Sequence, residues 1–133
     1  MAIANSVKVL MPGFGAPTEY QLAAAVALTH TGATISTAFT GFNNAVRTGK
    51  IRLQTVVPVV AATTITAIKI TGTDGTTTVT LYQDAVARTA GENESLVFNF
   101  ISDLYLTTVT VAITAGNAGA SDTTMDIEIA ANN

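Results

Sequence analysis

The sequence predicts an all-β fold, a single antiparallel β-sandwich of jelly-roll-like arrangement. Threonine and aliphatic residues alternate through three segments in the second half of the chain, residues 63–71, 77–82 and 107–114. A period of two is that of a half-buried β-strand. Turn residues recur between these segments at the short spacing that is typical of sandwiches, and an immunoglobulin-like sandwich is the alternative.

The first residues predict an extended N-terminal arm. Two prolines and two glycines fall between residues 12 and 17 and predict a loop, because this composition disrupts a β ladder. We therefore divide the chain into an arm and loop at residues 1–17 and one β-sandwich domain at residues 18–133. The arm could pair with an edge strand of its own body or of a neighbouring subunit. Its large apolar side chains include Val7, Val9 and Leu10.

Residues 19–28 fit two kinds of element. Thr18 followed by Gln21 fits a helix capping box, and the run of alanines favours a helix. We favour a strand, because the neighbouring segments are β and because the larger side chains alternate. As a strand, the segment would place on one face Tyr20, Leu22, Ala24, Val26 and Leu28. The next strand is predicted at residues 33–40, with a turn at residues 41–44.

The segment after residue 50 contains the clearest hairpin signal. Residues 51–59 suggest a long strand that Pro58 confines to an edge or interrupts, because proline cannot donate to a central ladder. Residues 64–71 and 77–83 form the next two predicted strands. The Asp-Gly pair between them, at residues 74 and 75, is typical of a hairpin turn.

Three later segments are predicted to fill the core. Residues 96–100 place the heaviest apolar cluster on one face, with Leu96, Phe98 and Phe100, and are our first choice for the core. Residues 106–114 would turn Val109, Val111 and Ile113 inward. The last strand alternates Met125, Ile127 and Ile129 with Asp126 and Glu128. The total is about eight strands, the number in a jelly roll.

Composition favours an assembly component. A chain of 133 residues is enough for one core, yet only 11% of its residues are charged, against about a quarter in typical soluble domains. A surface so poor in charge tends to associate, so we expect it to be covered by hydroxyl groups or by other subunits. The net charge of −3 argues against a nucleic-acid partner, which would require a surplus of basic residues.

The chain contains no cysteine, so disulfides, thiolate metal sites and cysteine nucleophiles do not arise. Its first ten residues lack the basic segment and long apolar stretch of a secretory signal. The most apolar stretch, residues 22–28, is far shorter than the roughly 20 residues that cross a bilayer. We therefore expect no membrane partner.

The sequence shows no catalytic, cofactor or metal site, and we expect the protein not to be an enzyme. The single histidine, His30, is predicted to be solvated or at a strand end, since no neighbouring residues suggest a triad. Asp126 and Glu128, with Asp122 before them, predict a solvated strand face, and a weak calcium site is the alternative. Gly13 and Gly15 lack the further glycine and lysine of a phosphate-binding loop.

A small basic group falls within six positions, at Arg47, Lys50 and Arg52. These residues fit either the solvated ends of a hairpin or a docking contact to an acidic partner. Together with the arm residues Val7, Val9 and Leu10, they are the candidate partner contacts.

A cysteine-free β domain that is rich in Thr, Ala and Val, lacks a signal and ends in alternating strands such as residues 124–129 resembles the small head proteins of tailed bacteriophages. The closest type is the decoration, or cement, protein. The resemblance implies a dimer or trimer on the capsid exterior of a virion, made in the host cytoplasm, that clamps neighbouring copies of the major capsid protein. The alternatives are a carbohydrate- or surface-binding module and a tail tube or fibre component.

Overall fold

The computed structural model describes residues 5–9, 18–28, 34–55, 63–86, 88–90, 95–116 and 123–133. All its regular elements are β-strands, and no helix in the described part is long and apolar enough to cross a membrane. The described strands are β1 (Asn5–Val9), β2 (Thr18–Leu28), β3 (Thr34–Phe39), β4 (Val46–Thr55), β5 (Thr63–Thr73), β6 (Thr78–Asp84), β7 (Arg88–Ala90), β8 (Ser95–Leu106), β9 (Thr108–Gly116) and β10 (Thr123–Asn132).

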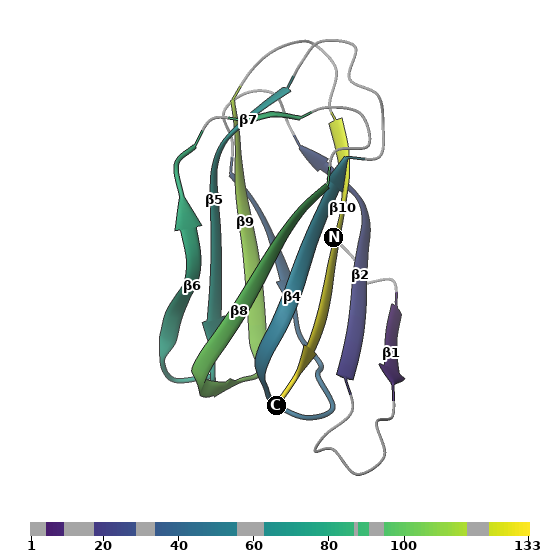
Figure 1. The fold of residues 1–133 in the computed structure, drawn as a ribbon, viewed down its shortest axis with the longest axis vertical. Helices are drawn as coiled ribbons and strands as arrows, with labels where there is room; N and C mark the ends of the chain where they lie inside the picture. Colours follow the sequence, from purple (N-terminus) through teal and green to yellow (C-terminus); the bar gives the residue numbers. More distant parts are fainter. Residues whose placement is uncertain are drawn as a thin grey trace.

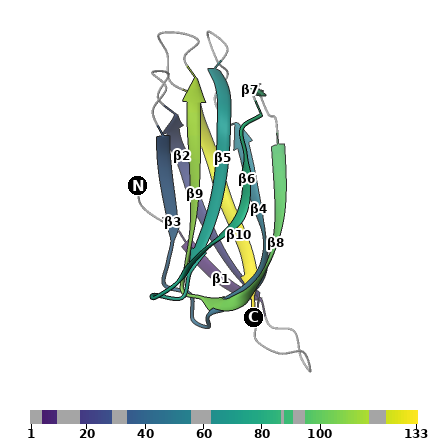
Figure 2. The same ribbon diagram turned by 90° about the vertical axis from the view of Figure 1, so that its left-hand side faces the viewer.

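The strands form two antiparallel sheets that lie face to face (Figures 1 and 2). The first sheet has the order β1-β2-β10-β4-β8, and the second has the order β3-β9-β5-β6, with β7 also paired to β5. Without β1 and β7, eight strands remain, and successive strands lie in opposite sheets except for the β5–β6 hairpin. This order is that of a jelly roll, which confirms the predicted fold. The immunoglobulin-like alternative is wrong, because that fold distributes its strands differently.

The arm contributes a strand to the first sheet. β1 pairs antiparallel with β2 of the same chain, from Asn5 opposite Leu22 to Val9 opposite Thr18. Of the two arrangements that the sequence allowed, pairing with its own body is therefore the one seen in the structure. Among the described strands, β1 and β8 are the two edges of this sheet.

The segment at residues 19–28 is a strand, as favoured from the sequence, but its side chains do not keep one alternation. Glu19, Gln21 and Ala23 are buried in its first half, whereas Val26 and Leu28 are buried in its second half. The pairing with β10 shifts between Met125 and Ile127, which inserts one extra residue in β2. The prediction that Tyr20 and Leu22 share a face with Val26 is therefore wrong, because a bulge reverses the alternation.

Ala25 forms this bulge with a φ of 52°, in the left-handed region that is costly for a residue with a Cβ. Its amide donates a hydrogen bond of 2.9 Å to Oδ1 of Asp126 on the neighbouring strand. The carboxylate thus replaces a partner that the interrupted ladder does not supply. Asp126, predicted to lie on a solvated face, has this structural role.

The core lies between the sheets and follows the alternation predicted for β9 and β10. Val109, Val111 and Ile113 are all buried, as are Met125, Ile127 and Ile129. Phe39 of β3 is fully buried and belongs to the same cluster. Of the predicted cluster in β8, Phe100 is buried, but Leu96 and Phe98 are only partly buried. β8 is an edge strand, so the opposite sheet covers its inward face less completely.

The β5–β6 turn is held by the side chain of Asp74. Its Oδ1 accepts hydrogen bonds from the amides of Thr76 at 2.8 Å and Thr77 at 2.7 Å, and Gly75 adopts a φ of 99°. Side-chain caps and a glycine at positive φ are what such turns require. The predicted Asp-Gly turn is therefore confirmed.

The turn predicts a pH-dependent contribution to stability. Hydrogen bonds from the amides of Thr77 and then Thr76 lower the pKa of Asp74 below its usual value of 3.8. A lowered carboxyl pKa stabilises the fold above pH 3.8, and this contribution is lost as the pH falls through the folded-state pKa. We expect Asp74→Ala to be less stable than the wild type at pH 7, with a difference that shrinks below pH 3.8 in urea unfolding. Asp74→Asn is the non-titrating control, and a difference independent of pH would contradict the assignment.

Candidate functional site

The outer face of the first sheet brings together side chains that are far apart in the sequence. The register places Tyr20 of β2 opposite Ala130 of β10, and Ala130 opposite Lys50 of β4. Lys50 in turn lies opposite Asn99 of β8. The next row along the same strands consists of Leu22, Glu128, Arg52 and Val97. Strand pairing alone therefore creates this surface.

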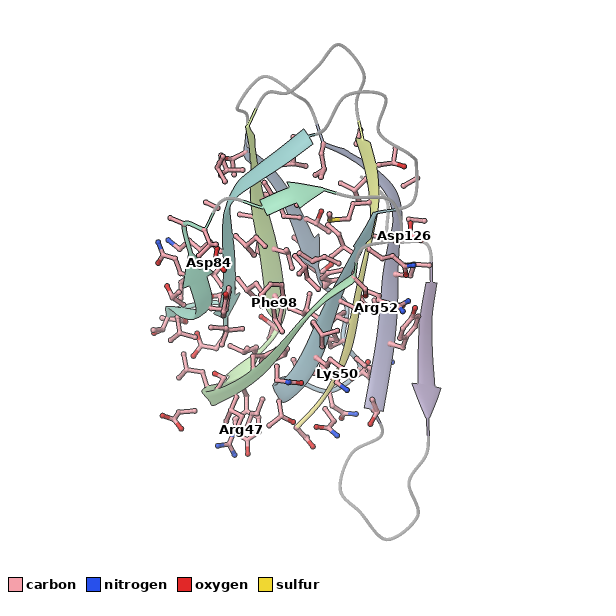
Figure 3. All side chains as sticks on the ribbon, turned by 45° about the horizontal axis from the view of Figure 1, so that its top comes forward. Arg47, Lys50, Arg52, Asp84, Phe98 and Asp126 are labelled. Carbon is pink, nitrogen blue, oxygen red and sulfur yellow. The ribbon has the colours of Figure 1, made fainter. Side chains whose placement is uncertain are left out.

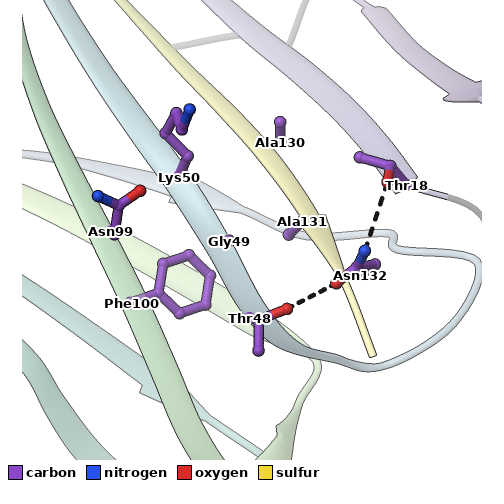
Figure 4. A pocket seen from close by; sticks show the side chains of 9 residues that line it. All are labelled: Thr18, Thr48, Gly49, Lys50, Asn99, Phe100, Ala130, Ala131 and Asn132. Atoms are coloured by element: carbon purple, nitrogen blue, oxygen red, sulfur yellow. Dashed lines mark hydrogen bonds between the residues drawn. The ribbon is translucent and has the colours of Figure 1, made fainter.

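A shallow trough crosses this face over β2, β10, β4 and β8 (Figure 4). It consists of two adjoining hollows of about 370 and 340 Å³ that share Lys50 and Ala130. Small residues line its middle, namely Gly49 and Ala130. A Cβ at Gly49 would approach the ring of Phe100 to 2.6 Å and the carbonyl oxygen of Ala130 to 2.8 Å, so this position has no room for a side chain.

Three linked side chains form one wall of the trough. The hydroxyl of Tyr20 donates a hydrogen bond to Glu128, and the guanidinium of Arg52 forms an ion pair with the same carboxylate. The Glu128 side chain is only 14% exposed, and burial raises its pKa above the usual value of 4.5. Glu128 therefore lies on the outer face but is not the solvated carboxylate that the sequence suggested.

Hydrogen bonds also fix the other end of the trough. Thr48 donates to Oδ1 of Asn132 at 2.6 Å, and Nδ2 of Asn132 donates to Thr18 at 3.4 Å. These bonds, drawn as dashed lines in Figure 4, connect β4, β10 and β2. These hydrogen bonds hold the polar side chains of Thr18, Thr48 and Asn132 in one arrangement.

Lys50 lies at the centre of the trough, where the two hollows meet. It is exposed, and no carboxylate of the described residues forms an ion pair with it. Arg52 beside it is already engaged by Glu128. The Lys50 ammonium group is therefore an exposed positive charge with no ion-pair partner among the described residues.

The structure separates the three basic residues that the sequence grouped. Lys50 and Arg52 lie on the outer face of β4, whereas Arg47 lies near the end of the sheet (Figure 3). Nε of Arg47 donates to the carbonyl oxygen of Ser102 at 3.2 Å, and its guanidinium carbon lies 5.1 Å from the centre of the Tyr105 ring. Arg47 is three residues before Lys50, so the alternation of a strand already separates it from the face of Lys50 and Arg52.

Of the three arm residues predicted to contact a partner, two lie in the described part of the chain. Val7 and Val9 lie in β1, opposite Tyr20 and Thr18. Leu10 lies outside the described residues, as do His30, Pro58 and Asp122.

An exposed apolar strip lies on β8 and was not predicted from the sequence. Val97 is 51% exposed and Ile101 is 81% exposed, although both are aliphatic. The alternation of the strand could have predicted it. Because Leu96, Phe98 and Phe100 were assigned to the inward face, the residues between them must point outward. Val97 and Ile101 lie on the outer face of the first sheet, the side that faces away from the second sheet.

Other chemistry is limited in the described part of the chain. It contains no group of three His, Asp or Glu residues that could hold a metal ion. The tyrosines of the described residues do not form a shared aromatic platform for a sugar. Tyr20 lines the trough, the ring centres of Tyr82 and Phe98 are 4.5 Å apart, and Tyr105 stacks with Arg47.

No family model matches this chain, and the comparison with curated proteins found no match. Among solved structures, a chain described as "CBM4 structure and function" aligns with 98% of this chain and 77% of its own length, at 12% identity and a TM-score of 0.38. A similarity of this size says nothing about ligand or partner.

Proposed function

We propose that this chain is a structural virion protein, a decoration protein that binds the outside of a bacteriophage head and clamps neighbouring capsid subunits. The resemblance in composition supports this proposal, as does the low share of charged residues, 11%. Jelly rolls occur in viral capsid proteins, but also in lectins, so the fold alone does not decide between them.

The observation that carries the proposal is the surface composed of the trough and the adjoining β8 strip. It combines the uncompensated charge of Lys50 with the exposed side chains of Val97 and Ile101. Protein interfaces typically join apolar contacts to charges that fix the orientation of the partner. The surface therefore fits an acidic, partly apolar segment of the major capsid protein.

A shallow surface can be sufficient for stable binding to a capsid, because the capsid repeats the same binding site many times. A capsid presents many identical sites, so modest contacts made by linked copies add through avidity rather than through one deep pocket. The outer edge of β1 could add a strand of a capsid subunit, because main-chain hydrogen bonds need no special side chains. In this arrangement Val7 and Val9 remain candidate contacts.

Charge reversal at the centre of the trough tests the proposal. We expect Lys50→Glu to weaken binding to heads that lack this protein by roughly tenfold per site, since it would repel the acidic partner. Lys69→Glu is the matched control, because Lys69 is an exposed lysine of the second sheet. Quantitative co-sedimentation with purified heads would measure both. Equal binding of Lys50→Glu and wild type, or no binding by the wild type, would refute the assignment.

A carbohydrate-binding module is the second candidate, and one feature of the trough favours it. The Tyr20 ring lies beside Glu128 and Arg52, and sugars are commonly bound by one ring with adjacent polar groups. A glycan array distinguishes the two functions. Binding that is lost in Tyr20→Ala would support this candidate, whereas an array without binding would remove it.

A further inference from the structure

β8 is an edge strand without the features that usually prevent pairing. Among the described strands it pairs only with β4, so its other side has no strand partner. Residues 95–102 contain no charged residue and no proline. Exposed edges normally carry such residues because their free N–H and C=O groups attract another strand. The edge of β8 is therefore suited to strand pairing.

The outward side chains of this edge have a symmetric pattern. Val97 and Ile101 are exposed on either side of Asn99, which is also exposed. In an antiparallel pair of identical strands, the residue on a twofold axis lies opposite itself, and its neighbours exchange places. An axis at Asn99 would thus place each Val97 opposite Ile101 of the second copy.

We propose that β8 pairs with β8 of a second copy of this chain, antiparallel, about a twofold axis at Asn99. Both apolar side chains would then meet apolar partners, and the two Asn99 amides could hydrogen-bond to each other. An axis at residue 98 would place Val97 opposite Asn99, and an axis at residue 100 would place it opposite Asp103. Of these three registers, only the axis at Asn99 matches the apolar residues.

The path of β8 excludes an axis nearer its C-terminal end. The pairing of β8 with β4 is regular from Ser95 to Ile101 and then shifts to Leu106. The four residues between them depart from the regular ladder. An axis at Ile101 would need these residues as a straight strand, whereas the axis at Asn99 pairs Val97 with Ile101, and both lie in the regular part.

Charge is compatible with this dimer. No charged residue lies on the pairing stretch, so identical strands would meet without repulsion. The nearest charges on the outer face are those of Asp103 on β8 and of Lys50 and Arg52 on β4. With the axis at Asn99, Asp103 of each copy would lie opposite Ser95 of the other, so no like charges would face each other across the pair.

The dimer would also present both troughs on one side. A twofold axis perpendicular to a continuous sheet keeps the outer faces of both copies on the same side. Two Lys50 troughs could then contact one particle surface together. This consequence rests on the proposed function, whereas the dimer itself does not depend on it.

Single cysteines would test the register, because the chain has no cysteine of its own. We expect Asn99→Cys to form a disulfide-linked dimer under mild oxidation, since the two side chains would lie directly opposite. Ile101→Cys is the matched control on the same face of the same strand. Its two thiols would be four residues apart along the strands, too far to join. No cross-link for Asn99→Cys, or equal cross-linking of both variants, would overturn the proposal.

Light scattering on the isolated protein would test association without phage heads. We expect a dimer for the wild type and a monomer for Ile101→Lys, because the variant removes the apolar cross-strand pair and places a lysine on the pairing edge. Circular dichroism should be unchanged, since Ile101 is 81% exposed. Val86→Lys, at an exposed valine outside β8, should remain dimeric. A monomeric wild type, or a dimeric Ile101→Lys, would overturn the proposal even if the protein binds heads.

Discussion

Glu19→Ala is expected to lower the free energy of unfolding by roughly 3 kcal/mol. Glu19 is fully buried, and its carboxylate holds the segment between β3 and β4. Oε1 accepts the amide of Asn43 at 2.6 Å and the side-chain Nδ2 of Asn43 at 3.1 Å, and Oε2 accepts the amide of Asn44 at 3.0 Å. The truncated variant would leave these donors without their partner and would create a cavity.

Urea unfolding followed by circular dichroism would measure this loss. Asp103→Ala is the control, because Asp103 is an exposed acid and its removal should change stability by less than about 0.5 kcal/mol. If Glu19→Ala unfolds at the same urea concentration as Asp103→Ala, the carboxylate does not hold the segment as described.

The second large effect concerns Gly72 of β5 and Leu106 of β8, which pack where the two sheets approach each other. A Cβ at Gly72 would lie 2.6 Å from Cδ1 of Leu106, and Leu106 is fully buried, so its side chain could shift only against other core residues. We expect Gly72→Ala to cost about 2 kcal/mol through overpacking. Leu106→Ala should cost about 3 kcal/mol through the cavity that it leaves.

The double variant makes this prediction specific. In Gly72→Ala combined with Leu106→Ala, the added methyl group would occupy part of the cavity. Its total cost should therefore be at least about 1 kcal/mol less than the sum of the single costs. Ile101→Ala, on the exposed face of the same strand, should cost under about 0.5 kcal/mol. Strictly additive costs would show that the two residues do not share this space.

Much of the fold could be predicted because local periodicity and tertiary burial agree in most strands. β9 is the clearest case, since Val109, Val111 and Ile113 alternate with threonines and are all buried. β2 shows the limit of this approach. Its alternation reverses at Ala25, whose amide is satisfied by Asp126, 101 positions away in the sequence. A bulge that depends on so distant a partner leaves no local signal.

The candidate site was predictable only in part, for the same reason. Lys50 and Arg52 stand out as a local basic pair, but Tyr20 and Glu128 join them only because β2, β10 and β4 are neighbours in the sheet. Arg47 was grouped with them because it is close in sequence, yet it contacts Ser102 and Tyr105 at the end of β8. Strand order, rather than residue spacing, decides which side chains share the trough.

The most direct measurement is density-gradient sedimentation of particles from the source lysate, with this chain and the capsid subunit quantified by mass spectrometry. A decoration protein should appear in the particle band in near-stoichiometric ratio to the capsid subunit. Recovery of this chain only in the soluble fractions would contradict its proposed place on the capsid exterior.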